Sequence, residues 1–157
     1  MTQEDKELLL RDLCGRVPYS VKCNHLDWDI NKQDYITRIS ILYAINSDYI
    51  PCFKYVGDDG CHYISESEFD IENIKPYLFP MSSMTEEQKI ECFKGTDIEL
   101  DEYNEIWSKF PISETDIPIT NLSNWLRVID WLNKHHFDYR GLIEKGLAID
   151  TTRLNIY

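Results

Sequence analysis

The 157-residue sequence has few glycines and none of the common motifs that hold phosphate, metal or a catalytic nucleophile. Its six glycines form no Gly-x-Gly-x-x-Gly run and no phosphate loop ending in Gly-Lys-Ser/Thr. A Gly-x-Ser-x-Gly elbow, a Cys-x-x-Cys pair and a His-Glu-x-x-His helix are missing as well. These motifs are typical of nucleotide sites, serine hydrolases, zinc or redox sites and zinc proteases. The sequence therefore assigns no activity, and it favours a non-enzymatic role.

Basic residues and long apolar runs are also scarce. The chain has 16 Lys and Arg but 28 Asp and Glu, so its formal net charge is -12. Binding to duplex nucleic acid or to an anionic membrane surface requires a cationic face, so we expect neither. No apolar run approaches the length of about 18 residues that spans a bilayer. The acidic start, Met1 to Lys6, is unlike a signal peptide. We expect a soluble, cytoplasmic protein with a single domain over residues 1–157.

The five cysteines are an odd number without a secretory signal, which predicts reduced thiols. Two predicted strands carry candidate zinc ligands, Cys23 and His25 on one and Cys61 and His62 on the other. Ligand pairs of structural zinc usually lie two to four residues apart in knuckle turns, and these spacings differ. We therefore expect no metal and no cofactor.

The order of helix, strands and helices predicts an α+β fold. Thr2 as N-cap and the leucines after it predict a helix over 3–14, ended by Gly15. A small, mainly antiparallel sheet is expected over 21–69. Its predicted strands are 21–28, 35–45, 52–56 and 61–65, with a hairpin at Asp59-Gly60. In the second strand, the odd positions from Tyr35 to Ile45 are mostly apolar, and the even ones include Arg38 and Ser40. This alternation predicts a half-buried strand.

The helical part is expected over 85–146, packed on the sheet. Pro76 and Pro80 favour an extended connector before it. Thr85 and Gln88 form a capping-box pattern that predicts a helix to about residue 93. The strongest helical pattern covers 123–136 and should bury Trp125, Ile129 and Leu132 against the sheet. Two further helices are considered, one over 99–110 and one over 139–145 with Asp138 as N-cap and Gly146 after its end.

One candidate site is the junction between the last two expected helices. It gathers two imidazoles, a carboxylate, a phenol and a guanidinium: His135, His136, Asp138, Tyr139 and Arg140. Such groups could line a polar pocket for an anion, helped by backbone N–H groups of the short helix. A His–Asp pair can also orient a general base. The structural alternative is that the histidines meet the negative end of a helix dipole and that Asp138 is only a cap.

The second candidate is the acidic stretch over 85–116, which carries ten acids and three lysines. It could steer the protein towards a basic partner or mimic a phosphate backbone. The alternative is a solvated face that keeps the protein in solution. The candidate partner-binding residues of this stretch are Asp97, Glu99, Asp101 and Glu102.

Three segments carry a family resemblance. They are EDKELLLRDLCGRVP (4–18), KPYLFPMSSMTEEQ (75–88) and LNKHHFDYRGLIEKGLAI (132–149). Together they resemble a family of small proteins from gut Bacteroidales genomes and their phages. The resemblance implies a phage or mobile-element setting. It implies no activity, cofactor or catalytic residue.

Three hypotheses follow from these observations. The first is a non-enzymatic interaction protein that binds, and thereby modulates, a host macromolecule. The second is a binder of a small anionic ligand or nucleotide near His136, Asp138 and Arg140. The third, and least favoured, is a hydrolase that uses the same histidines. A ligand site requires a pocket where an imidazole and Arg140 converge, whereas an interaction protein requires an exposed acidic or aromatic patch.

Overall fold

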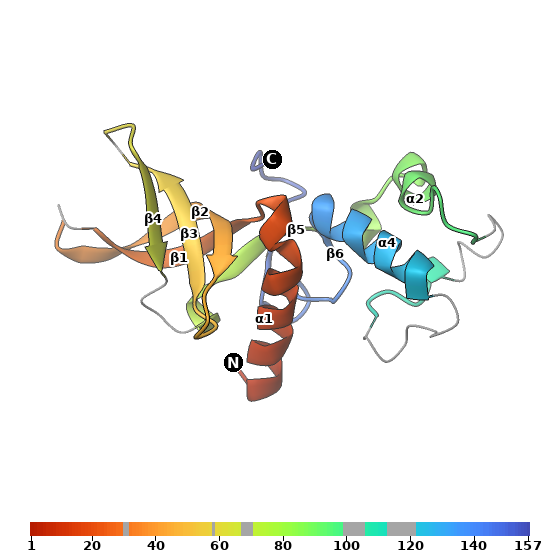
Figure 1. Ribbon diagram of the computed structural model, residues 1–157, viewed down its shortest axis with the longest axis horizontal. Coiled ribbons are helices and arrows are strands. Elements are labelled where there is room, and N and C mark those ends of the chain that lie inside the picture. Colours follow the sequence, from red (N-terminus) through yellow and green to blue (C-terminus); the bar gives the residue numbers. More distant parts are fainter. Residues whose placement is uncertain (30–31, 58, 67–70, 99–105, 113–121) are drawn as a thin grey trace.

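The computed structural model has the α+β architecture that the sequence predicts (Figure 1). Helix α1 (Gln3–Arg16) lies between a curled sheet at one end of the molecule and helices α2 (Glu86–Cys92) and α4 (Leu122–Lys134) at the other. The described residues are 1–29, 32–57, 59–66, 71–98, 106–112 and 122–157. In this part of the chain, no helix is both long and apolar enough to cross a membrane.

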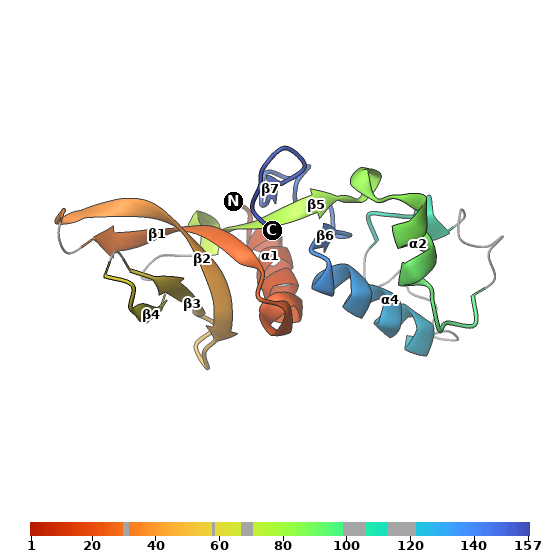
Figure 2. The ribbon, with the colours of Figure 1, turned by 90° about the horizontal axis from the view of Figure 1, so that it is seen from above.

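The sheet is mostly antiparallel, as expected. Its first four strands form a meander: β1 (Lys22–Asp29), β2 (Asp34–Ile45), β3 (Pro51–Val56) and β4 (His62–Glu66). The segment expected as an extended connector is itself a strand, β5 (Lys75–Pro80), which pairs with β1. Two short parallel strands, β6 (Phe137–Asp138) and β7 (Ile149–Asp150), pair with β5. The order β4-β3-β2-β1-β5-β6 leaves β4 at one edge, and Figure 2 shows β5 running from the meander towards α2.

Helix α1 begins as predicted but continues past its expected end. Thr2 and Asp5 form a reciprocal capping box at its start. Gly15 lies inside the helix, because α1 passes close to α4 at this point. A Cβ on Gly15 would lie only 3.2 Å from Nδ2 of Asn133. Gly15 therefore permits close helix packing, and the left-handed conformation occurs instead at Ser20, after a short 3-10 turn.

Helices α2 and α4 agree with the sequence prediction, whereas the last expected helix is not formed. The capping box of Thr85 and Gln88 is present at α2. The expected helix over 99–110 falls largely on residues 99–105, which lie outside the described residues. The expected helix over 139–145 is absent, because Gly141 has a φ of +73° and the chain forms turns there. Gly146 does take the left-handed conformation.

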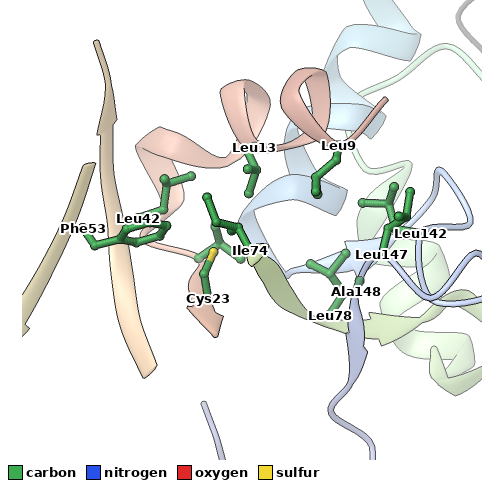
Figure 3. Packing of buried hydrophobic residues seen from close by; sticks show 11 residues of the cluster. Leu9, Leu13, Cys23, Leu42, Phe53, Ile74, Leu78, Leu142, Leu147 and Ala148 are labelled. Atoms are coloured by element: carbon green, nitrogen blue, oxygen red, sulfur yellow. The ribbon is translucent and has the colours of Figure 1, made fainter. Parts of the chain in front are cut away.

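The described side chains form two separate cores. In the first, Leu9 and Leu13 of α1 pack on Leu42 and Phe53 of the sheet (Figure 3). In the second, α2 and α4 pack together around Trp125, Val128 and Leu132, with Phe93 and Phe137. Trp125 and Leu132 are buried as expected, and Ile129 is half-buried. They do not lie against the meander, however, because α1 occupies that place.

Truncating the second core should destabilise the protein. Leu132→Ala removes a side chain that has no exposed surface and should lower the free energy of unfolding by about 2–5 kcal/mol. The matched control is Leu126→Ala on the same helix, where the side chain is 58% exposed. Its expected effect is within about 0.5 kcal/mol. Urea unfolding of both variants measures the difference, and equal losses would contradict this assignment of the helix faces.

Candidate functional site

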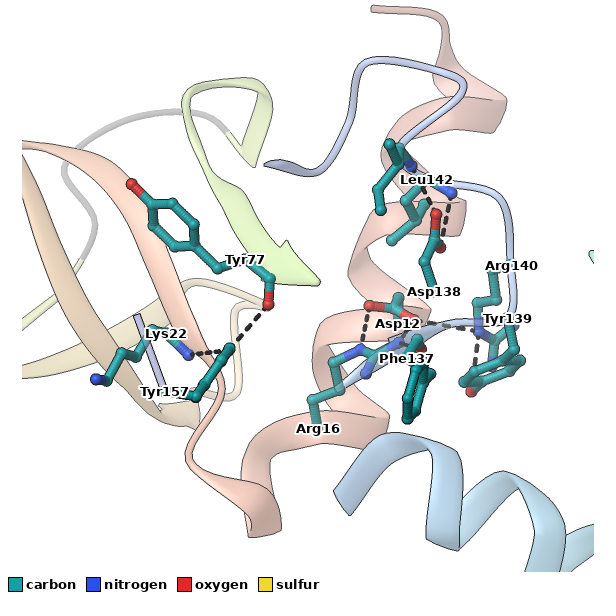
Figure 4. Close-up of polar contacts among 11 residues, drawn as sticks. Asp12, Arg16, Lys22, Tyr77, Phe137, Asp138, Tyr139, Arg140, Leu142 and Tyr157 are labelled. Carbon is teal, nitrogen blue, oxygen red and sulfur yellow. Dashed lines mark hydrogen bonds and ion pairs between the residues drawn. The ribbon is translucent and has the colours of Figure 1, made fainter. Parts of the chain in front are cut away.

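A buried ion pair organises the junction that the sequence singled out (Figure 4). Arg16 donates to Asp12 through two bonds of 2.6 and 3.0 Å, and both side chains are fully buried. Arg16 also donates to the carbonyl of Phe137 at 2.8 Å. Nε of Arg140 lies 3.6 Å from Oδ1 of Asp12 and donates to the hydroxyl of Tyr139 at 3.2 Å. Arg16, Tyr139 and Arg140 thus make contacts inside the protein.

Asp138 also has an internal role. Its carboxylate accepts hydrogen bonds from the backbone N–H groups of Leu142 and Ile143, at 2.8 and 2.7 Å. Burial raises the pKa of Asp138, and these two hydrogen bonds offset only part of that effect. Asp138 therefore accepts the backbone hydrogen bonds expected of an N-cap, but the residues that follow it form turns and not a helix.

His135 and His136 lie together on a separate open pocket of about 520 Å³, whose lining includes Lys134 and Tyr157 but neither Asp138 nor Arg140. The ring of His136 stacks on Tyr157 with centroids 4.2 Å apart, and His135 stacks on Trp131 at 3.9 Å. Burial, with a contribution from the nearby charge of Arg16, lowers the pKa of His136 to about 4. His136 is therefore neutral at pH 7.

The other candidate residues lie apart. Asp97 is exposed after α2, and Glu99, Asp101 and Glu102 lie outside the described residues. Cys23 is buried, while His25 stacks on Phe53 and shares a 3.0 Å hydrogen bond with Ser40. Across the residues that the structure describes, no three His, Cys, Asp or Glu side chains are grouped so that they could hold a metal ion.

The sequence pattern did not indicate which face of strand β2 is exposed. Ser40 and Leu42 are buried on the side that α1 covers, whereas Ile39, Ile41 and Tyr43 are 49%, 37% and 54% exposed. The mostly apolar face of this strand therefore points outward, which reverses the usual arrangement, and the alternation predicted only the period.

Contacts on the inner face explain this reversal. Arg38 donates to Asp27 at 2.8 Å, and its guanidinium lies 4.2 Å from the centroid of the Tyr55 ring. Ser40 is satisfied by His25. The polar residues of β2 thus find partners inside the fold, which removes most of the cost of burying them.

The outward side chains form a groove on the sheet. Cross-strand pairing gives one row over four strands, from Lys22 through Ile41 and Lys54 to Ile64. The groove has a volume of about 700 Å³. We define the sheet groove by the outward residues Lys22, Ile39, Ile41, Tyr43, Lys54, Val56 and His62.

The charge of the sheet groove is opposite to that of the whole chain. Among the described residues no acid lines it, although the chain has 28 acids. Within the described part of the chain, neither Lys22 nor Lys54 pairs with a carboxylate. Lys22 instead contacts the carbonyl of Ile156 and lies 5.5 Å from the ring centroid of Tyr157. The groove is thus apolar and cationic.

No family model, curated protein or solved structure matches this chain. The choice between the groove and the His135–His136 pocket therefore depends on their geometry and charge.

His136 should make the protein less stable in acid. Its pKa is about 4 in the folded state and about 6.5 when unfolded, so only the unfolded chain is extensively protonated between these values. Stability from this group is present above pH 6.5 and is lost as the pH falls towards 4. Because the ring is partly exposed, His136→Asn should reduce the loss between pH 7 and pH 5 by about 1 kcal/mol.

Asparagine is chosen because it does not titrate here and tolerates the φ of +60° at position 136. The matched control is His62→Asn at an exposed position. Urea unfolding at both pH values measures the effect. An unchanged pH dependence in His136→Asn would show that this imidazole is not kept neutral by the fold.

Proposed function

We propose that the protein is a non-enzymatic interaction protein that binds another protein through the sheet groove. The observation that carries this proposal is the set of apolar side chains that point outward along β2, namely Ile39, Ile41 and Tyr43. Val56 on β3 extends this apolar surface. Contiguous exposed apolar surface is uncommon on monomeric proteins and marks interaction sites. A partner that covers these side chains would remove them from water, which supplies the main favourable term in most protein association.

The sequence resemblance to phage and mobile-element proteins supports a biological setting for this proposal, in which the protein acts on a host cell. In that setting the partner is a host macromolecule, and binding modulates it. The chemistry of the groove adds that this partner is a protein, because the groove lining is mainly aliphatic and tyrosine side chains.

The charges near the second pocket support this choice over a site for a small anion. His136 is neutral at pH 7, and the guanidinium of Arg140 is engaged with Asp12 and Tyr139. Lys134 therefore supplies the positive charge of that pocket. In addition, Ser83 in its lining donates its hydroxyl to the carbonyl of Pro80 and not to a histidine. A hydrolase would need a nucleophile bonded to a base.

Removing apolar surface from the groove should release the partner. The double variant Ile39→Thr, Ile41→Thr keeps β-branched residues in β2 and should weaken binding by about tenfold or more. The matched control is Ile90→Thr with Leu154→Thr, two exposed apolar side chains outside the groove. Quantitative affinity capture from lysate of the native cells compares the variants. If every captured protein is retained equally by both, the groove is not the binding surface.

The acidic stretch gives a separate prediction. If it steers a basic partner, neutralising Asp97, Glu99, Asp101 and Glu102 together should slow association at low salt and leave dissociation nearly unchanged. Surface plasmon resonance with the captured partner measures both rates, and circular dichroism checks folding. An unchanged association rate would mean that the stretch is only a solvated face.

A further inference from the structure

We propose that the His135–His136 pocket binds a neutral, planar aromatic molecule whose edge carries a hydrogen-bond donor beside an acceptor, as an aromatic amide or a nucleobase does. The pocket is separate from the sheet groove, so this inference goes beyond the proposed function and does not depend on it. It follows from three features of the pocket: its aromatic walls, its charge, and the hydrogen-bonding groups that its polar side chains present.

Aromatic rings from three parts of the chain meet in this pocket. Phe79 comes from β5, and Tyr157 from the segment after β7. His136 and Phe137 lie just after α4. The ring centroid of Phe79 lies 5.9 Å from those of both Phe137 and Tyr157. Ring faces and edges attract one another, so a flat ring is the group that such walls favour.

The size of the pocket suits a small molecule. Sites for small ligands are clefts of about 300–1,000 Å³, lined mainly by apolar and aromatic side chains with a few placed polar groups. This pocket has a volume of about 520 Å³. Its polar groups, from Ser83, Thr85, Gln88, His135 and Thr152, accompany the rings.

The charge of the pocket favours a neutral molecule. Among the described residues, no Asp or Glu lines it, so a cationic ligand would meet no carboxylate. Lys134 is the one Lys or Arg side chain among these lining residues, and it is exposed. An exposed ammonium group is well hydrated and adds little to the binding of an anion.

Two polar groups on the walls define the edge of the ligand. Nδ1 of His135 lies 2.8 Å from the carbonyl oxygen of Trp131, which can only accept. Nδ1 therefore donates, and Nε2 of the neutral ring is an acceptor. Oε1 of Gln88 accepts from the backbone N–H of Thr85, which leaves the Gln88 NH₂ group as a donor. This donor and this acceptor match the carbonyl and the N–H of an amide.

The test uses three probes of nearly the same shape: benzamide, benzoate and methyl benzoate. Each is titrated into the ¹⁵N-labelled full chain at pH 8, where imidazoles with their ordinary pKa of about 6.5 are neutral. Benzamide should bind about fivefold more tightly than the other two, because it alone is uncharged and supplies both a donor and an acceptor. Its binding should shift the amide signals of Gln88, His135 and His136.

A conservative variant tests the hydrogen bond itself. Gln88→Glu removes the donor but keeps the cap of α2, because Glu serves in a capping box as Gln does. It should weaken the binding of benzamide by about fivefold. The matched control, Gln3→Glu, makes the same change of charge on α1, outside the pocket, and should leave binding unchanged. Circular dichroism checks that both variants are folded.

Four outcomes would overturn the inference. Tighter binding of benzoate would indicate an anion site at Lys134, and equal binding of benzamide and methyl benzoate would indicate a purely apolar cleft. The inference is also wrong if Gln88→Glu retains benzamide as well as the native chain does, or if benzamide fails to bind near its solubility limit. None of these results concerns the sheet groove, which the Ile39→Thr, Ile41→Thr variant tests separately.

Discussion

The buried pair of Asp12 and Arg16 is the constraint on which the arrangement of this molecule depends. Both charges are removed from water, so each requires the other, and losing one partner of such a pair typically costs about 3–5 kcal/mol. The pair also reaches beyond its own helix. Arg16 donates to the carbonyl of Phe137 in β6, and Arg140 approaches Asp12. Helix α1 is thereby fixed to the segment that follows α4, and the two cores are held in one relative position.

Fixing α1 in this place decides which face of the sheet is covered. Leu9 and Leu13 bury the inner face of the meander, and α4 packs with α2 in the other core. In the described part of the chain, no helix covers the outer face of β2. The exposed row of Ile39, Ile41 and Tyr43 is therefore a consequence of the two-core architecture. A surface of this kind is stabilised when a partner covers it, and this links the architecture to the proposed function.

Local signals in the sequence predicted most elements correctly. The capping boxes at Thr2 and Thr85, and the alternation in β2, depend on residues within a few positions of one another. The errors arose where distant contacts override local preference. Gly15 lies inside a helix because Asn133, far along the chain, packs against it. The helix expected over 139–145 is replaced by turns around Gly141.

The candidate site could be predicted only in part, for the same reason. His135 and His136 lie on one pocket, but the other three residues of the predicted junction site do not line it. Arg140 could not be placed, because its partner Asp12 lies 128 positions earlier in the chain. The local pattern also could not indicate which face of β2 is buried. Arg38 and Ser40 become suitable for burial only because Asp27 and His25 on β1 form hydrogen bonds with them.

The same ion pair also affects the charge at the junction. The positive charge of Arg16 adds to burial in lowering the pKa of His136, so the imidazole is neutral at physiological pH. Asp12 in turn engages the guanidinium of Arg140. The network that stabilises the fold thus takes two cationic groups away from the junction. Lys54 lies outside this network, on the apolar sheet groove.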